Sequence, residues 1–347
     1  MNKLNILILG GGVFLGAAAL QSALQRGHSV TAFNRGRSRN TWPAGVEALT
    51  GDRAIDLGAL QGRHWDAVID TCGYVPADVQ ASAEALRGTA CYLFVSSISV
   101  YATTTQVPVR ETDALASFND LARDDRSLEH YGPQKAACEA EVQRLFGERA
   151  LIVRPGLIVG PGDRSGRFSH WPWRALAGGD MLVPDVPRGE PLQFIDVRDL
   201  GDWMVRLLET EQRGVFNATG PVRDGESAVC DWHALLQTCT DAVAARGFAP
   251  ARGVPVDEPF LVEQDVQPWS ELPLWLPSSD PEYAGFNRVD LCRARAAGLR
   301  TRTLRDTVDA VLDEGQPALD DRRRAGKITR EKEAQLLAGW TGASVGY

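Results

Sequence analysis

The feature that most constrains the fold is a glycine-rich segment between an apolar run and an alanine-rich stretch near the start of the chain. The apolar run covers residues 4–9, and the segment that follows reads Gly10-Gly11-Gly12-Val13-Phe14-Leu15-Gly16. Such a turn directs the backbone N–H groups of a helix N-terminus toward a phosphate. A strand, a glycine turn and a helix in this order predict a dinucleotide-binding unit, in which Gly10 permits the turn and Gly16 lets the helix pack on the strand. Glycines also form plain turns, so the pattern alone is weak evidence.

Short apolar runs alternate with helical patterns through the first half of the chain. We expect strands over residues 4–9, 29–34, 46–50, 67–71, 91–96 and 151–154. We expect helices over residues 16–26, 77–86 and 134–146. Near-continuous apolar strands that alternate with helices predict a parallel sheet covered on both faces, which is a doubly wound α/β fold of Rossmann type. Such sheets bind ligands at the carboxyl ends of their strands.

The composition changes after about residue 155, where glycine, proline and tryptophan become frequent. We expect helices here over residues 200–211, 231–245, 288–297 and 330–340. We therefore predict a dinucleotide-binding domain over residues 1–155. Residues 156–347 are predicted to form a smaller, interleaved lobe that mainly binds substrate and returns some segments to the sheet.

Composition and charge limit the classes of partner. The 347 residues carry a formal net charge of −8, so no global basic field attracts nucleic acid, and we expect no nucleic-acid partner. The six cysteines are scattered without a C-x-x-C pair, which argues against a disulfide framework or a zinc site and for reduced thiols. We expect no bound metal. The first strand begins too early for a signal peptide, and no apolar run is long enough to span a membrane, so we expect a cytoplasmic protein.

The end of the second predicted strand bears on the choice of cofactor. NAD-binding proteins of this type usually carry an acidic residue here, which bonds the ribose 2′-hydroxyl. This chain instead reads Asn34-Arg35-Gly36-Arg37-Ser38. Arginine forks suit a 2′-phosphate, so the segment favours NADP(H) over NAD(H). The alternative is that the two arginines are exposed turn residues.

Two further segments are candidates for the chemistry. Asp52, followed by Arg53, ends the third predicted strand, where a carboxylate can accept a hydrogen bond from the adenine amino group. Tyr131 and Lys135 are four residues apart, which places both on one face of a helix. A nearby ammonium lowers the pKa of a phenol toward the range useful for acid–base catalysis. The alternative is an exposed helical pair, but a serine-rich strand end at residues 94–101 could hold a substrate oxygen.

Taken together, these segments resemble the extended and atypical short-chain dehydrogenases/reductases, the NAD-dependent epimerase/dehydratase superfamily. The resemblance covers roughly residues 4–315. The matching segments are residues 9–16, 51–53, 94–101, 131–135, 154–162, 194–200 and 214–220. Each segment is a weak signal, but their common order predicts the family's fold.

The resemblance implies roles for individual residues. Tyr131 would be the acid–base group, Lys135 would lower its pKa and bond the nicotinamide ribose, and Ser97 would orient the reacting oxygen. Other residues would line the cofactor after the later strands; they are Thr71, Cys72, Gly73, Ser96 and Pro155. The resemblance is also compatible with a homodimer that pairs through the helix bearing Tyr131.

The chain departs from the family pattern at several positions. Val13 stands where the glycine loop usually has its middle glycine, and Leu157 stands where nucleotide-sugar enzymes often carry asparagine. The arginine-rich segment that holds a nucleotide-sugar diphosphate is replaced by residues 277–286. These departures favour a reductase or dehydrogenase with a smaller or less charged substrate.

Several other residues are weighed for the substrate pocket. Ser99, Leu157, His170, Trp171 and Arg198 are the candidates. For His170 and Trp171, loop aromatics that pack the second lobe are an equally good interpretation. Residues 196–199 are expected to form a turn that caps a helix, from which Arg198 can reach the substrate. Cys72 is expected to be a small buried residue of the cofactor site and not a nucleophile.

The sequence therefore predicts an NAD(P)-dependent oxidoreductase that interconverts a carbonyl and an alcohol on a small-molecule substrate, with Tyr131 as acid–base. The first alternative is a nucleotide-sugar or related epimerase or dehydratase that keeps NAD(P) bound. The second is a non-catalytic, cofactor-sensing or RNA-associated regulatory protein. Relatives with such roles commonly lose the Tyr–Lys pair, which this chain keeps.

Overall fold

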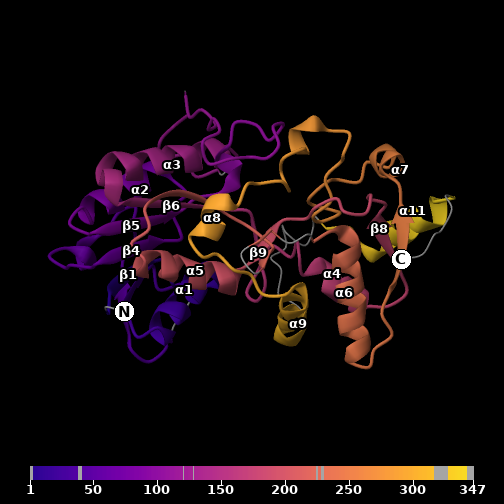
Figure 1. Ribbon diagram of the computed structural model, residues 1–347, viewed down its shortest axis with the longest axis horizontal. Coiled ribbons are helices and arrows are strands. Elements are labelled where there is room, and N and C mark those ends of the chain that lie inside the picture. The colour runs from indigo at the N-terminus through magenta and orange to yellow at the C-terminus, as the bar shows by residue number, and fades with distance from the viewer. Residues whose placement is uncertain are drawn as a thin grey trace.

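The structure is a computed structural model that describes residues 3–37, 41–119, 121–127, 129–223, 226–227, 230–315 and 327–341. Figure 1 shows an elongated molecule of two lobes, with the N-terminus in the lobe that holds the large sheet and the C-terminus in the other. In the described part of the chain, no helix has the length and apolar character needed to cross a membrane.

The first lobe is built on a parallel sheet of seven strands. Across the sheet the strands lie in the order β10, β6, β5, β4, β1, β2, β3. They are β1 (Asn5–Leu9), β2 (Ser29–Asn34), β3 (Val46–Thr50), β4 (Ala67–Asp70), β5 (Cys91–Val95), β6 (Ala150–Pro155) and β10 (Gly214–Ala218). Every neighbouring pair is parallel. Because the connections run outward in both directions from β1, this is the doubly wound sheet of Rossmann type that the sequence predicts.

Helices cover both faces of this sheet. The covering helices are α1 (Phe14–Gln25), α2 (Pro76–Ala85), α3 (Tyr131–Phe146) and α5 (Val197–Glu209). Ile6 and Ile8 of β1 belong to the core under α1 and α5, whereas Leu7 and Leu9 belong to the core under α2 and α3. Figure 1 shows these two helix layers above and below the strands. Burial on both sides explains why the strand reads as a continuous apolar run.

The second lobe has its own core and small parallel ladders. Strand β8 pairs with β13, and β7 pairs with β9. Its strands are β7 (Leu157–Val159), β8 (Asp180–Pro184), β9 (Phe194–Asp196), β11 (Val222–Arg223), β12 (Glu226–Ser227) and β13 (Arg252–Val256). The later helices are α4 (His170–Leu176), α6 (Trp232–Ala245), α7 (Glu258–Glu263), α8 (Cys292–Ala296), α9 (Leu304–Glu314) and α11 (Arg330–Gly339). Single 3₁₀ turns are η1 (Gly58–Leu60), η2 (Ile98–Val100), η3 (Gly147–Arg149) and η4 (Pro281–Tyr283).

The second half differs from the sequence expectation in several elements, including helix α7, which the sequence does not predict. The tryptophan-rich segment is a helix, α4, in which Pro172 lies in the first turn, where its missing N–H costs nothing. The helix expected over residues 288–297 is confined to α8. Helix α9 was not expected, although Thr303 and Asp306 form a capping box at its start. The chain also returns to the large sheet as β10, and the division at residue 155 stays a prediction.

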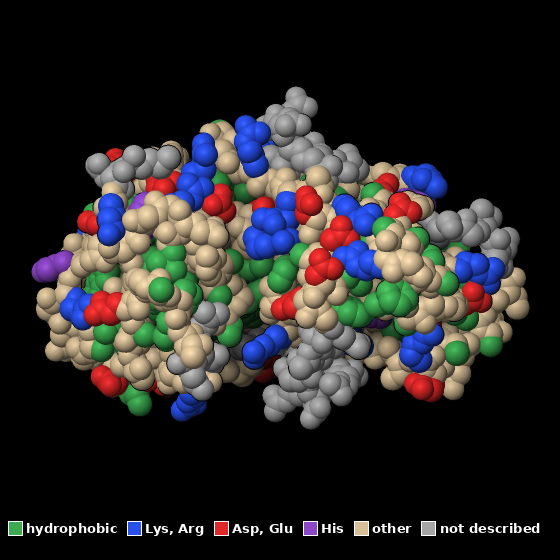
Figure 2. Space-filling view, turned by 90° about the horizontal axis from the view of Figure 1, so that it is seen from below, with side chains coloured by type: hydrophobic (Ala, Val, Ile, Leu, Met, Phe, Trp, Pro, Cys, Tyr) green, Lys and Arg blue, Asp and Glu red, His purple; other side chains and the backbone are tan. Residues whose placement is uncertain are grey.

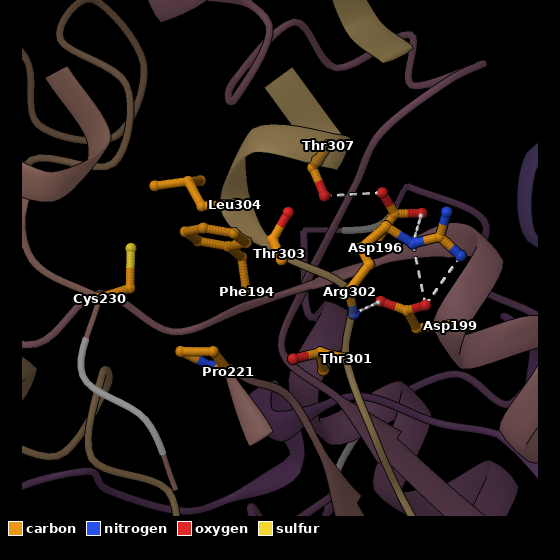
Figure 3. Close-up of a pocket in the computed structure, with 10 residues that line it drawn as sticks. All are labelled: Phe194, Asp196, Asp199, Pro221, Cys230, Thr301, Arg302, Thr303, Leu304 and Thr307. Atoms are coloured by element: carbon orange, nitrogen blue, oxygen red, sulfur yellow. Dashed lines mark hydrogen bonds and ion pairs between the residues drawn. The ribbon is translucent and has the colours of Figure 1, made fainter. Parts of the chain in front are cut away.

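Figure 3 shows a small cavity where segments of the two lobes meet. Asp196 caps α5 by accepting a hydrogen bond from the Arg198 N–H at 2.9 Å, as the sequence predicts, and it also accepts one from the Thr307 hydroxyl at 2.9 Å. Arg302 forms an ion pair with Asp199 at 2.8 Å. The cavity has a volume of ≈ 20 Å³, which is room for one water. These contacts join α9 and the strand β9 to α5, and they leave no space for a substrate.

Helix α5 lies directly on the backbone of α1 at Gly201. A Cβ atom at this position would lie 2.8 Å from the carbonyl carbon of Ala18 and 2.9 Å from the nitrogen of Ala19. Both of these atoms belong to backbone, which cannot move aside as a flexible side chain can. The absence of a side chain at Gly201 therefore sets the distance between the two helices on this face.

We expect Gly201→Ala to lower the free energy of unfolding by about 1 kcal/mol or more, because the overlap outweighs the gain in helix propensity. The matched control is Gly88→Ala, where a Cβ would meet nothing within 4 Å. That change should be neutral or stabilising by about 0.5 kcal/mol. Denaturant unfolding measures both variants, and equal stabilities would contradict this account of the helix contact.

Candidate functional site

A cleft of ≈ 1080 Å³ lies at the carboxyl ends of the sheet strands, between the two lobes. Its lining includes the glycine-rich loop, the ends of β1 to β6 and the start of α3. The second lobe contributes residues of the loop after β7, together with Trp269 and Phe286. The cleft is large enough for a dinucleotide and a substrate, and its position is the one expected for ligands of a doubly wound sheet.

The glycine-rich loop forms the cradle that the sequence predicts. Gly10 has φ +94°, and a Cβ at Gly16 would lie 2.5 Å from the Gly10 carbonyl oxygen, so neither position accepts a side chain. No side chain caps the N-terminus of α1, and its first turn holds no acidic residue. The backbone N–H groups of that turn thus face the cleft without a side-chain acceptor, as an anion site requires.

The two non-glycine residues of the loop also face the cleft. Val13 is 40% exposed and lines the cleft. Phe14 has φ +45°, which is the left-handed region that a bulky residue rarely adopts. Strain of this kind collects at ligand sites. The residues predicted for this loop all line the cleft; they are Gly10, Gly12, Val13, Phe14, Leu15 and Gly16.

Only some of the residues predicted to bind the 2′-phosphate at the end of β2 line the cleft. The Asn34 side chain accepts a hydrogen bond from the Gly36 N–H at 2.6 Å and so holds the turn. Asn34 and Arg35 line the cleft, whereas Arg37 is exposed outside its lining. Ser38 lies outside the described residues.

Arg53 has a buried partner that the sequence analysis missed. Its guanidinium forms a two-point ion pair with Asp70, with both N···O distances 2.8 Å, and also donates to the Ser82 hydroxyl at 2.5 Å. The Tyr92 hydroxyl donates to the same carboxylate at 2.9 Å. Burial alone would raise the pKa of Asp70, but Arg53 outweighs it and the pKa is lowered. Arg53 and Asp70 are therefore both ionised, and their opposite charges cancel. Arg53 lines the cleft next to Asp52.

The end of β4 supplies the next part of the floor. Thr71 and Cys72 line the cleft, and the Thr71 hydroxyl donates to the Leu9 carbonyl at 3.0 Å. Desolvation raises the pKa of the Cys72 thiol to about 11, so it is protonated at neutral pH, although the residue is half-buried and not fully buried as expected. Gly73 lies behind the surface of the cleft, where a Cβ would lie 2.5 Å from the Phe94 ring. Ser96 and Pro155 line the cleft as predicted.

The structure brings Ser97, Tyr131 and Lys135 together on one wall of the cleft. Tyr131 is the first residue of α3, and a Cβ at Gly132 would lie 2.2 Å from the Ser99 carbonyl oxygen. The helix can therefore start against the end of β5 only because residue 132 is glycine. The Ser97 hydroxyl donates to the Ser99 hydroxyl at 3.1 Å and accepts from the Ser99 N–H at 3.0 Å, and its side chain lies close enough to Tyr131 to influence the pKa of the phenol.

Tyr131 and Lys135 have opposite pKa shifts with the same main cause. Burial raises the pKa of the Tyr131 phenol, and the nearby Ser97 side chain opposes part of that rise. Burial lowers the pKa of Lys135 to about 8. The ammonium donates to the Gly73 carbonyl at 2.7 Å and the Val95 carbonyl at 2.5 Å. At neutral pH Tyr131 is therefore a neutral phenol, which is the protonation state of a proton donor, and Lys135 is mainly a charged ammonium.

The five substrate candidates fall into two groups. Ser99 and Leu157 line the cleft, whereas His170, Trp171 and Arg198 do not. Trp171 is fully buried and donates to the Pro273 carbonyl at 3.1 Å, and the ring of His170 packs on it at 4.9 Å. Burial lowers the pKa of His170 to about 3. These two aromatics pack the second lobe, and Arg198 is held by Asp196 at the junction of the lobes.

Several residues that line the cleft are not marked by any sequence motif. They are Tyr74, Asp78, Arg126, Arg164, Arg167 and Phe286. Arg126 forms a two-point ion pair with Asp78, with both N···O distances 2.8 Å. Arg167 lies over the Trp269 ring at 5.5 Å, and Trp269 meets Phe286 edge-on at 4.9 Å. Asp78 lies in the first turn of α2, and the others come from loops, where no periodic pattern marks a side chain that faces a ligand.

The outer surface carries charges of both signs. Figure 2, which is seen from below the view of Figure 1, shows basic and acidic side chains interspersed over that face of the molecule. Neither sign forms an extended patch on the described part of that face. This face offers no basic stripe of the kind that tracks a phosphate backbone.

The fold and the cleft define the class of the protein, a Rossmann-type α/β protein with a cleft shaped for a dinucleotide. The profile of the NAD dependent epimerase/dehydratase family matches residues 6–219, more than half of the chain. The chain belongs to this family, which confirms the resemblance seen in the sequence.

Three curated relatives match at modest identity. The 2′-dehydrokanamycin reductase of Streptomyces kanamyceticus is 27% identical over 226 residues, which cover 62% of this chain and 61% of the relative. The 2-alkyl-3-oxoalkanoate reductase of Stenotrophomonas maltophilia is 28% identical over 211 residues, covering 56% and 62%. The chloroplast stem-loop binding protein of 41 kDa b of Arabidopsis thaliana is 28% identical over 233 residues, covering 62% and 58%. The match thus spans about three-fifths of the length of each relative.

Solved structures support the fold. A UDP-galactose 4-epimerase has a TM-score of 0.59 at 17% identity, over 90% of this chain and 100% of that one. The Bordetella bronchiseptica enzyme WbmG, in complex with NAD and UDP, has a TM-score of 0.61 at 18% identity, over 90% and 94%. At such identities the likeness establishes the architecture and not the reaction.

The lowered pKa of Lys135 gives a prediction with a defined pH window. Burial lowers the pKa from 10.5 to about 8, so between these values the unfolded chain holds more protons than the native protein. As the pH increases through that window, the free energy of unfolding of the wild type should rise relative to that of Lys135→Met. The total rise should be about 1–3 kcal/mol. Below pH 8 the difference between the two proteins should stay constant.

Urea unfolding of both proteins from pH 7 to pH 10.5 measures this difference. All other titrating groups are common to the two proteins, so their contributions cancel. A difference that does not change over the window would contradict a buried lysine with a lowered pKa.

Proposed function

We propose that this protein is an NADP(H)-dependent oxidoreductase that reduces a carbonyl group to an alcohol. The observation that carries the proposal is that Ser97, Tyr131 and Lys135, the last one turn further along α3, all line the cleft that holds the glycine-rich loop. The names of two relatives, a 2′-dehydrokanamycin reductase and a 2-alkyl-3-oxoalkanoate reductase, support the same class of reaction.

The chain's own residues supply the proton side of this reaction. Bound NADPH supplies the hydride that is added to the carbonyl carbon. Tyr131 is neutral at pH 7 and donates its proton to the carbonyl oxygen, so hydride and proton together give the alcohol. Ser97 orients that oxygen through its hydroxyl. The charge on Lys135 lowers the energy of the tyrosinate left behind, which regains a proton from the solvent in the cleft.

The preference for NADP(H) rests on the end of β2. No acidic side chain stands at the position that would bond a ribose 2′-hydroxyl, because Asn34 ends the strand and Arg35 follows it. Arg35 lines the cleft and has no ion-pair partner among the described residues. A 2′-phosphate would give this guanidinium a partner of opposite charge.

A second candidate is an epimerase or dehydratase that keeps its cofactor and returns the hydride. The match to the NAD dependent epimerase/dehydratase family favours it, whereas Leu157 in the cleft departs from the asparagine frequent in nucleotide-sugar enzymes. Cofactor stoichiometry separates the two. With a panel of carbonyl substrates, one NADPH should be consumed for each alcohol formed. Turnover without net loss of NADPH would favour the epimerase.

A third candidate, an RNA-associated or cofactor-sensing protein, is suggested by the chloroplast stem-loop binding relative. The net charge of −8 argues against RNA as the principal partner. The presence of Ser97, Tyr131 and Lys135 in one cleft also argues for catalysis, because a protein that only senses a cofactor does not need a proton donor.

Replacing Tyr131 with Phe removes the proposed proton donor. We expect kcat for carbonyl reduction to fall by about 10²- to 10⁴-fold, with the Kd for NADPH changed by less than about twofold. The matched control is Tyr283→Phe, since Tyr283 is 37% exposed and does not line the cleft. Steady-state kinetics and NADPH fluorescence titration measure both. Full activity in Tyr131→Phe would reject the catalytic role.

Replacing Arg35 with Gln tests the cofactor preference. We expect the Kd for NADPH to rise by about tenfold and the Kd for NADH to change little, because only NADPH carries the 2′-phosphate. Arg37→Gln is the neighbouring comparison and should have a smaller effect, since Arg37 does not line the cleft. Equal Kd values of the wild-type protein for NADPH and NADH would contradict the proposed preference for NADP(H).

A further inference from the structure

Five arginines line the cleft, and the described residues engage three of them. Arg53 and Arg126 form two-point ion pairs with buried aspartates, and Arg167 lies over the Trp269 ring. Arg35 and Arg164 have no hydrogen bond, ion pair or ring contact with any residue that the structure describes. The cleft therefore presents two uncommitted cations, one from each lobe.

The loop that carries Arg164 lies against the glycine-rich loop. A Cβ at Gly162 would lie 3.5 Å from Cδ2 of Phe14 and 3.8 Å from its Cα, so the backbone of this segment of the second lobe packs on the first turn of α1. Arg164 follows two residues later and lines the same cleft. Its guanidinium is thus attached within reach of the uncapped N-terminus of α1.

The backbone around Arg164 is held in place on both sides. The carboxylate of Asp163 is buried and accepts hydrogen bonds from the Ser165 N–H at 2.7 Å and the Ser165 hydroxyl at 2.8 Å. The Gly162 N–H donates to both carboxylate oxygens of Glu314 at 2.9 Å. Arg164 is exposed, and its side chain has no partner among the residues that the structure describes. Because this backbone is already fixed, anion binding at Arg164 has to order only the arginine side chain and not the loop.

We propose that Arg164 binds the pyrophosphate of the dinucleotide from the second lobe, opposite the glycine-rich loop. This inference rests on the proposed cofactor but not on the reaction. A pyrophosphate carries two negative charges, and a guanidinium fork matches its oxygens at two points. Because Val13 replaces a glycine of the loop, the first lobe offers a side chain where close backbone approach is usual, and a cation from the second lobe offsets that loss.

Arg35 and Arg164 would then bind two different groups of NADPH. Arg35 lies at the end of β2, on the side of the 2′-phosphate, and Arg164 lies over the start of α1, on the side of the pyrophosphate. NADH retains the pyrophosphate and lacks the 2′-phosphate, whereas adenosine 2′-phosphate has the reverse composition. These ligands separate the two arginines by binding alone.

The experiment measures Kd for NADPH, NADH and adenosine 2′-phosphate in the wild type, Arg164→Gln and Arg35→Gln. For Arg164→Gln, we expect the Kd for NADPH and for NADH to rise by about tenfold each, and the Kd for adenosine 2′-phosphate to stay unchanged. For Arg35→Gln, the Kd for adenosine 2′-phosphate should rise and that for NADH should not. Arg188→Gln, an exposed arginine of the second lobe outside the cleft, is the charge-matched control.

The outcomes are distinct. If Arg164→Gln leaves the Kd for both dinucleotides unchanged, or weakens adenosine 2′-phosphate equally, the proposal is overturned, and a raised KM for anionic substrates would then assign Arg164 to the substrate. Failure of every carbonyl compound to be reduced would reject the proposed reaction and leave these binding results standing. The midpoints of thermal unfolding should match the wild type, because Arg164 has no described partner to lose.

Discussion

The contact on which the rest of the structure depends is the approach of helix α1 to the end of β1, where the Gly10 carbonyl leaves no room for a side chain at Gly16. This approach starts the helix at the edge of the sheet with its N–H groups uncapped. The first lobe then has a positively polarised site at the point where the sheet's connections diverge. The position of the cleft and the placement of any dinucleotide in it follow from this contact.

A second close approach places the proposed catalytic side chains. The contact of Gly132 with the Ser99 carbonyl lets α3 begin against the loop after β5, which brings Tyr131 to Ser97. Lys135, one turn later, is then fixed between the carbonyls of Gly73 and Val95. Gly16 and Gly132 each lack a Cβ that would separate a helix from the strand ends. These two glycines therefore determine how α1 and α3 meet the cleft.

The sequence predicted the parts of the fold that local patterns determine. The strands of the first half and helices α1 to α3 agree with the expected ranges to within a few residues, because apolar strands buried on both faces leave a continuous signal. It missed α4, because the run Trp171-Pro172-Trp173 reads as a loop until tertiary burial of Trp171 is known. The partners of Arg53, and the freedom of Arg164, depend on residues distant in sequence, which no local pattern encodes.

The central claim is that the cleft holds a nicotinamide dinucleotide with its reactive ring beside Tyr131, and a crystal structure with NADP⁺ bound tests it most directly. The account predicts a pyrophosphate at the N-terminus of α1 between Val13 and Arg164, a 2′-phosphate at Arg35, and a nicotinamide ring facing the Tyr131 hydroxyl. A dinucleotide bound in the reverse direction, or with its nicotinamide away from Tyr131, would contradict the account.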